Sequence, residues 1–281
     1  MEMLEFVALE AVAASTVLEE SAAFLFLARI RQSIRSINSA WDRLMRHAVV
    51  YILMPAVNFV SHRCFVQHRP DGFADRFKEL LPLQRVWEKG RRGNNRGDYV
   101  RLYFLLSNLE ALTKDGVPGA FAELGVYKGT TARIMQIVAP DRELFLFDTF
   151  DGLPEQHVVV DPVSNEMSGS YAESLEEVRR LIGDADNIHY CAGIFPETAE
   201  LVPPETSFAL VHLDCDLYAP TKAALEFFYP RMNAGALLVL HDYHSGCWPG
   251  VTNAVNEFMA DKPEQLILIP DKSGTAAFRR I

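Results

Sequence analysis

Cysteine is scarce in this chain, and no two cysteines form a Cys-x-x-Cys pair. The four cysteines stand at positions 64, 191, 215 and 247. This spacing favours neither a disulfide framework nor a structural zinc site. We therefore expect a reducing, cytoplasmic location for the protein.

Basic residues are fewer than acidic residues in this chain. The 281 residues include 27 Lys and Arg against 37 Asp and Glu, which gives a formal net charge of -10. Binding to a nucleic-acid duplex needs clustered positive surface, and the basic residues gather only over 29–46 and 89–96. We expect no nucleic-acid partner.

Long uninterrupted apolar runs are missing as well. The N-terminus carries Glu2 and Glu5 where a secretory signal would carry basic residues. The stretch 6–28 contains three glutamates, and 48–60 is short and broken by Pro55, whereas a membrane span needs ~20 apolar residues. We expect no transmembrane segment.

Two parts of the chain differ in their apolar pattern. Over 1–68, apolar residues recur at the spacing typical of helices. From residue 119 onward, short apolar runs alternate with amphipathic segments, which predicts a mostly parallel sheet with helices on both faces. We expect a helical extension over 1–90, which docks on the other domain or forms a homo-oligomer, and an α/β domain over 91–281.

The pattern gives approximate bounds for the elements of the α/β domain. Strands are predicted over 120–126, 144–147, 188–192, 208–213 and 236–240, with helices over 99–114, 130–138, 175–182, 221–229 and 251–259. Segments 265–269 and 276–280 would close the sheet as an antiparallel pair.

Two of the predicted strands end abruptly in polar side chains. Asp214 and Asp216 follow the fourth strand, while His241 and Asp242 follow the fifth. Because buried parallel strands deliver their carboxyl ends to one edge of the sheet, we expect Asp214 and Asp242 to meet there. They would hold a divalent cation that polarises a substrate hydroxyl, and their oxygen ligands favour Mg²⁺.

A glycine loop follows the first predicted strand. Gly125 lies where the backbone turns tightly and allows a ligand to approach. The loop lacks the G-x-G-x-x-G spacing, and Glu123 suits the cationic end of a ligand better than a pyrophosphate. Asp148 ends the second strand, where a carboxylate either binds ribose hydroxyls or caps the next segment. Together, the loop and Asp148 indicate a nucleoside ligand.

Five ordered motifs resemble those of the TylF/macrocin O-methyltransferase family. They are Glu-Leu-Gly-Val-Tyr-Lys-Gly (123–129), Asp-Thr-Phe-Asp-Gly-Leu-Pro (148–154), Gly-Ile-Phe-Pro-Glu-Thr (193–198), His-Leu-Asp-Cys-Asp-Leu-Tyr (212–218) and His-Asp-Tyr (241–243). The resemblance runs from about residue 95 to the C-terminus and does not explain residues 1–90. It implies a class I methyltransferase (Rossmann-like) fold, with seven strands of which the last is antiparallel. It also implies a metal-dependent enzyme that methylates a hydroxyl of a sugar or glycosylated small molecule with S-adenosylmethionine.

The resemblance further implies roles for individual residues. Glu123 and Gly125 would line the methionine end of the cofactor, Asp148 would bind its ribose, and Asp216 would act as general base. Further cofactor contacts would come from Tyr127, Gly129, Thr130, Asp151, Gly193 and Asp214. The metal ligands would be Asp214, His241 and Asp242.

His241 departs from the family pattern, which usually has Asp-Asp at this place. Imidazole suits Mn²⁺, Fe²⁺ or Zn²⁺ better than Mg²⁺. His241 would therefore bind one of these metals, contact the cofactor, act as a second base or simply be hydrogen-bonded structure. The sequence leaves these roles open.

Other assignments also keep alternatives. Tyr218, Tyr243, His244 and Trp248 would either form an acceptor pocket or pack in the core, and segment 155–172 is either a lid or a surface connection. A nicotinamide-dependent sugar oxidoreductase fits the same fold but would need the missing glycine spacing and a Tyr-x-x-x-Lys pair. A non-catalytic relative would use its N-terminal helices for assembly.

Overall fold

The computed structural model describes Leu44 and residues 81–87, 98–159, 161 and 168–281. The chain divides into two compact units, Met1–Glu79 and Leu80–Ile281, and every described residue except Leu44 belongs to the second. Most of the extension predicted over 1–90 lies outside the described residues, so its helices and its role in oligomer formation stay predictions. The lid predicted over 155–172 is described only in part.

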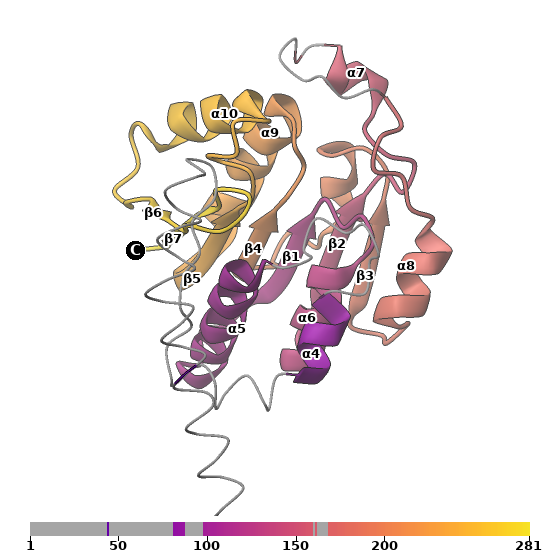
Figure 1. The fold of residues 1–281 in the computed structure, drawn as a ribbon, viewed down its shortest axis with the longest axis vertical. Coiled ribbons are helices and arrows are strands. Elements are labelled where there is room, and N and C mark those ends of the chain that lie inside the picture. The colour runs from indigo at the N-terminus through magenta and orange to yellow at the C-terminus, as the bar shows by residue number, and fades with distance from the viewer. Residues whose placement is uncertain (1–43, 45–80, 88–97, 160, 162–167) are drawn as a thin grey trace, which may run out of the picture. The chain divides into compact units, whose positions relative to one another are not determined.

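Within the described residues, seven strands form one sheet in the order β3-β2-β1-β4-β5-β7-β6 (Figure 1). They are β1 (Ala120–Leu124), β2 (Leu144–Asp148), β3 (Ile188–Ala192), β4 (Phe208–Leu213), β5 (Met232–Leu240), β6 (Ile267–Leu268) and β7 (Ala276–Arg279). Neighbours from β3 to β5 are parallel, and β7 is antiparallel to both β5 and β6. The predicted sheet with an antiparallel last strand is confirmed.

Helices connect and cover the strands. The described helices are α4 (Leu81–Trp87), α5 (Tyr99–Lys114), α6 (Thr130–Val138), α7 (Glu155–Val158), α8 (Leu175–Ile182), α9 (Tyr218–Phe228) and α10 (Pro249–Met259), with short 3-10 turns at Glu197–Leu201 and Tyr229–Arg231. Helices α4, α5 and α8 contact α6, while α9 packs on α10. None of the helices described is both long and apolar enough to cross a bilayer.

Four element starts differ from the predicted bounds, and one of them is that of β6, which begins at Ile267 rather than at residue 265. α9 begins at Tyr218 and α10 at Pro249, earlier than residues 221 and 251. Pro220 and Pro249 fit there because the first turn of a helix does not need the N–H that proline lacks. β5 begins at Met232 rather than 236, because Met232 pairs with Phe208 of β4 although the residues that follow it are less apolar.

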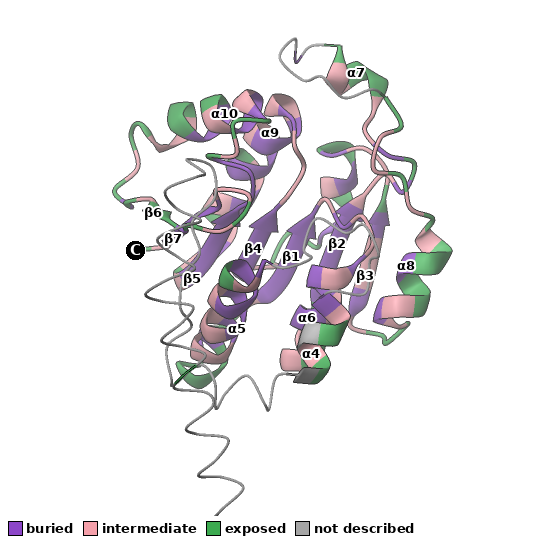
Figure 2. Ribbon diagram, in the orientation of Figure 1, coloured by how far each residue is buried: buried purple, intermediate pink, exposed green. Residues whose placement is uncertain are grey.

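The inner strands form the centre of the core. All five residues of β1 and all six of β4 are buried, as the purple arrows of Figure 2 show. Strands of a parallel sheet are apolar throughout when helices cover both faces. This burial fixes where β1 and β4 end, and so where the polar residues after them begin.

The strand register brings β4 and β5 to a common end. Leu213 pairs with Leu240, the last residue of each strand. Beyond the strands, the amide of His241 donates to the carbonyl of Leu213 at 2.9 Å, and the amide of Asp214 donates to that of Leu124 at 2.8 Å. Asp214 and His241, the first residues after β4 and β5, therefore lie side by side at the edge of the sheet.

Candidate active site

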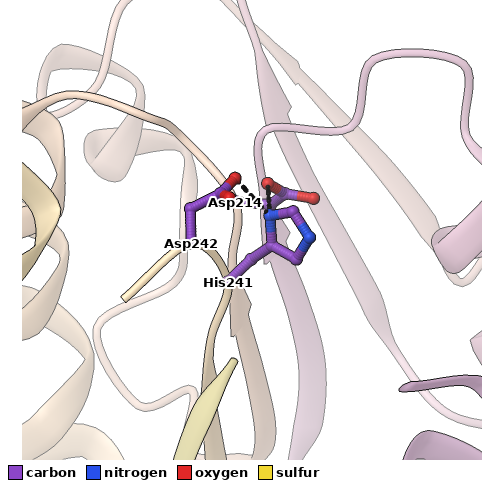
Figure 3. Close-up of side chains that lie close together, drawn as sticks. All are labelled: Asp214, His241 and Asp242. Carbon is purple, nitrogen blue, oxygen red and sulfur yellow. Dashed lines mark ion pairs between the residues drawn. The ribbon is translucent and has the colours of Figure 1, made fainter. Parts of the chain in front are cut away.

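Asp214, His241 and Asp242 converge just beyond the ends of β4 and β5 (Figure 3). One ligand atom of each residue lies within 4.8 Å of the others. The Nδ1 of His241 lies 2.6 Å from an oxygen of Asp214 and 2.6 Å from an oxygen of Asp242. The predicted meeting of Asp214 and Asp242 is therefore found, with His241 between them.

The three donors fit a divalent cation. The His241 side chain is 3% exposed, yet neither ring nitrogen makes a hydrogen bond of normal geometry, although two carboxylate oxygens approach Nδ1. Two carboxylates and an imidazole around one point suit Mn²⁺, Fe²⁺ or Zn²⁺, and the carboxylates also suit Mg²⁺. Among the residues that the structure describes, no other group of three His, Cys, Asp or Glu side chains gathers in this way.

Neighbouring charged side chains shift the pKa values of Asp214 and His241 in this cluster. Burial disfavours the charged form of Asp214, but His241 and Arg101 hold the pKa of Asp214 well below its ordinary value. Burial also disfavours the imidazolium of His241, and Asp214 and Asp242 nevertheless raise the pKa of His241 to about 10. A coordinating imidazole must be neutral, so a proton and a cation compete for this nitrogen.

A cavity opens beside the cluster, along the carboxyl ends of β1, β2 and β4. The predicted site residues that line it are Gly125, Tyr127, Asp148, Gly193, Asp214 and Asp216. The predicted residues that do not line it are Glu123, Gly129, Thr130, Asp151, His241 and Asp242. Ligands of parallel sheets bind at this edge, so the cavity is the natural place for the predicted nucleoside.

Several lining residues were not among the predicted site residues. Thr149 and Leu153 belong to the motif over 148–154, which was read only for its acidic residues. His157 and Tyr171 come from the predicted lid and face the same cavity. The sequence pattern assigned both residues only to the predicted lid or surface connection and not to a ligand site.

Glu123 is buried and does not line the cavity. It is 1% exposed, and its Oε1 lies 3.0 Å from the Nδ1 of His212. Burial and the nearby charge of Asp214 raise the pKa of Glu123 well above its ordinary value, and burial lowers the pKa of His212 to about 3. Both groups favour their uncharged forms and form a buried pair. This geometry lends no support to the predicted contact of Glu123 with a cofactor ammonium group.

Asp148 organises the glycine loop. Its Oδ2 accepts hydrogen bonds from the amides of Val126 and Tyr127, both at 2.8 Å, and its Oδ1 accepts one from the amide of Phe150 at 2.8 Å. The bond to Phe150 closes a local turn of the kind aspartate often makes, without a helix after it. Asp148 also lines the cavity, and its contact with a ribose stays a prediction.

Gly125 connects the glycine loop to the cluster. Its φ of +89° lies in the left-handed region, and a Cβ built on it would stand 1.9 Å from the main-chain oxygen of Asp214. Only glycine permits this approach. The position of Asp214 therefore depends on the absence of a side chain at residue 125.

We expect Gly125→Ala to lower the free energy of unfolding by about 3 kcal/mol or more, because Asp214 must move away from the new Cβ. Gly116→Ala is the matched control, since Gly116 has a φ of +65° but a Cβ there would meet nothing within 4 Å. The control should lose only about 1–2 kcal/mol from backbone strain. Chemical denaturation followed by circular dichroism measures both, and equal losses would contradict the steric argument.

Asp216 lies in a tight turn. β4 ends at Leu213, Asp216 has a φ of +65°, and the amide of Leu217 donates to the carbonyl of Cys215 at 2.7 Å. Asp214 and Asp216 therefore do not lie on a continued strand. The turn nevertheless places both residues at the cavity. Strained non-glycine backbone of this kind often occurs at functional sites.

The aromatic residues proposed for an acceptor pocket make structural contacts. The hydroxyl of Tyr218 donates to Glu257 and that of Tyr243 to Asn256, both at 2.6 Å, which ties each to α10. The ring of Trp248, which is 8% exposed, lies 6.3 Å from that of Tyr171. The cavity is lined by none of Tyr218, Tyr243, His244 and Trp248, so their contact with an acceptor stays a prediction.

Two curated proteins resemble part of this chain. The 8-demethyl-8-(2,3-dimethoxy-alpha-L-rhamnosyl)-tetracenomycin-C 4'-O-methyltransferase of Streptomyces olivaceus is 32% identical over 149 residues, which cover 48% of this chain and 57% of that protein. The mycinamicin III 3''-O-methyltransferase of Micromonospora griseorubida is 29% identical over 174 residues, which cover 56% of this chain and 67% of that protein. The chain thus spans 57% and 67% of the lengths of these two relatives.

Two solved structures share the fold. The O-methyltransferase NovP matches with a TM-score of 0.55 and 25% identity, over 64% of this chain and 79% of that chain. CalS11, a calicheamicin methyltransferase, matches with a TM-score of 0.54 and 23% identity, over 76% of this chain and 95% of that chain. The sheet order and these likenesses identify the class I methyltransferase fold.

The family profile described as Macrocin-O-methyltransferase (TylF) matches residues 97–276. This range runs from just before α5 into the start of β7 and contains the whole cavity and the cluster beside it. The chain therefore belongs to the TylF macrocin O-methyltransferase family of enzymes.

Proposed function

We propose that this protein transfers a methyl group from S-adenosylmethionine to a hydroxyl of a sugar or glycosylated small molecule, and that it needs a divalent cation to do so. The observation that carries the proposal is the cluster of Asp214, His241 and Asp242 beside a cavity that Asp216 also lines. Family membership supports the class of reaction, and the cluster supports its dependence on metal.

The acceptor class follows from the relatives. One of them carries a rhamnosyl unit in its printed name and acts at a 4' oxygen, and the other acts at a 3'' oxygen of mycinamicin III. Both names describe methylation of a hydroxyl on an elaborate small molecule. We therefore propose a sugar hydroxyl of a glycosylated compound as the acceptor of this chain.

Methyl transfer of this kind needs alignment and removal of one proton. The hydroxyl oxygen forms a bond to the methyl carbon while the bond from carbon to sulfur breaks, so the three atoms must lie in line. The loop at Gly125 and Asp148 would hold the donor, because both residues line the cavity. Asp216 would accept the proton from the hydroxyl as general base.

The cation would be held by the carboxylates of Asp214 and Asp242 together with Nδ1 of His241. When bound, it supplies Lewis acidity, which lowers the pKa of a hydroxyl and fixes its orientation. Asp214 lines the cavity and belongs to the cluster, so it connects the two parts of the proposed site.

Removal of metal tests this proposal. Treatment with EDTA should lower turnover with labelled S-adenosylmethionine and a panel of glycosides by about a hundredfold or more. Activity should return when the chelator is removed and Mn²⁺ is added, at least as well as with Mg²⁺, because the imidazole of His241 favours the softer ion. Turnover that is unchanged in metal-free protein would contradict the proposal.

Ligand binding separates this function from a nicotinamide-dependent reaction. S-adenosylhomocysteine at about 100 times its Kd should stabilise the folded protein by about 2.7 kcal/mol, and NAD should not. Thermal melting with each ligand measures the difference. Stabilisation by NAD alone would contradict the proposal and favour the oxidoreductase.

A further inference from the structure

We propose that Arg101 is a positioning residue that orients Asp214 for the cation, and this inference rests on the proposed metal site. Arg101 lies on α5, and its side chain is completely buried. Its Nη1 lies 3.8 Å from Oδ2 of Asp214. No sequence motif pointed to this residue, and it does not line the cavity.

The two oxygens of Asp214 face different partners. Oδ2 lies toward Arg101 at 3.8 Å, while Oδ1 lies 2.6 Å from Nδ1 of His241. Attraction on one oxygen fixes the rotation of the carboxylate and turns the other oxygen toward the cluster. Groups behind a metal ligand commonly set its orientation in this way, and their loss weakens metal binding.

Arg101 also contacts Asp98 and Trp87. Its Nε lies 3.7 Å from Oδ2 of Asp98, and its guanidinium carbon stands 4.9 Å from the centroid of a Trp87 ring. The indole N–H of Trp87 donates to the carbonyl of Asp98 at 3.1 Å, and Oδ1 of Asp98 accepts from the amide of Arg101 at 3.3 Å. These contacts leave the guanidinium little freedom, as a positioning residue requires.

The charge of Arg101 allows two explanations to be compared: Arg101 orients Asp214, or Arg101 is only a positive charge near the cluster. A positive charge beside a cation site repels the cation, so its removal alone should tighten metal binding. Asp98 offsets the charge of Arg101, which leaves the negative charges of Asp214 and Asp242 for the cation. If Arg101 orients Asp214, its removal should weaken metal binding. The two accounts therefore predict effects of opposite sign.

One of the residues that contact Arg101 lies outside the range matched by the family profile. Trp87 ends α4, ten residues before the match begins at residue 97. The helix α4 also contacts α6, which follows the glycine loop. The segment before the family region thus contributes directly to the packing behind the cluster.

The test compares the affinity of Arg101→Met and wild-type protein for Mn²⁺, measured by electron paramagnetic resonance of the free ion. The affinity for S-adenosylhomocysteine, measured by calorimetry, reports whether the cavity is intact. Arg142→Met is the control, because Arg142 likewise lies over an aromatic ring, that of Phe121 at 5.1 Å, but bonds the carbonyls of Val117 and Gly119, away from the cluster. Methionine keeps the length of the arginine stem in both variants.

Arg101→Met should raise the Kd for Mn²⁺ by about tenfold or more, with the Kd for S-adenosylhomocysteine within about threefold of wild type. Arg142→Met should change neither. A Kd for Mn²⁺ that is unchanged or lower in Arg101→Met would overturn the inference, and so would an equal loss of both ligands. Absence of Mn²⁺ binding in the wild-type protein would instead reject the proposed function.

Arg101→Lys decides the matter if Arg101→Met does not fold. Lysine keeps the charge, but its single ammonium cannot reach Asp98 and Asp214 together as the guanidinium does. A folded Arg101→Lys protein should therefore bind Mn²⁺ about threefold or more weakly than wild type. Wild-type affinity in this variant would show that charge alone suffices and would overturn the inference.

Discussion

Replacing Asp216 by asparagine should lower methyl transfer by about a thousandfold while the protein keeps its affinity for metal and for S-adenosylhomocysteine. Asp216 lines the cavity but does not belong to the cluster of metal donors. Its loss should therefore remove the base without removing the cation. Single-turnover rates with saturating donor and glycoside measure the chemical step directly.

Asparagine suits this test because of the backbone at residue 216. Asp216 has a φ of +65°, and asparagine tolerates the left-handed region better than other replacements do. The turn should therefore survive. Asp186→Asn, on an exposed loop before β3, is the control for a lost carboxylate and should keep full activity. Turnover of Asp216→Asn within about tenfold of wild type would refute the role of Asp216 as base.

Replacing Asp214 by asparagine should strongly weaken metal binding and also destabilise the fold. Asp214 supplies one of three donors, so the Kd for Mn²⁺ should rise by about a hundredfold or more. The change also leaves the completely buried Arg101 without its partner at the cluster. Breaking such a pair costs about 3–5 kcal/mol, and we expect roughly 2–3 here because the Asp214 side chain is 26% exposed.

Asp216→Asn is the matched comparison for Asp214→Asn. Both variants should lose methyl transfer, but only Asp214→Asn should lose Mn²⁺ and stability. Titration with Mn²⁺ and denaturation with urea separate the two variants. Wild-type affinity for Mn²⁺ in Asp214→Asn would mean that the cation, if present, binds elsewhere.

The architecture and the meeting of acidic residues were predictable because they depend on local patterns. Apolar runs that end in Asp214 and Asp242 predict neighbouring parallel strands with a shared edge, and the pairing of Leu213 with Leu240 confirms it. The motif resemblance predicted the family, and the match over residues 97–276 confirms that as well.

The finer geometry of the site depends on contacts between distant segments, which no local pattern reports. Asp216 lies in a turn rather than on a strand, because β4 ends once its apolar run ends. Glu123 is the one charged residue among the apolar residues of β1. It faces His212 on the neighbouring strand β4. Its side chain is thereby kept in the core and away from the cavity.

Arg101 shows a sequence signal of its burial. It lies on the same buried face of α5 as Leu105 and Leu109, where a charged residue is unusual. A buried arginine needs a carboxylate partner, and Asp98 stands three residues before it. The pattern thus contained a prediction of a buried ion pair. That Asp214 is the second partner depends on the packing of α5 against the sheet and was not readable from the sequence.

One cation should lie between Asp214 and Asp242 in the proposed site. Crystals grown with Mn²⁺ and S-adenosylhomocysteine should show an anomalous-difference peak about 2.1–2.3 Å from a carboxylate oxygen of each residue. His241 Nδ1 should lie at a similar distance. A peak elsewhere, or none at this place in crystals of protein that is active with Mn²⁺, would contradict the account.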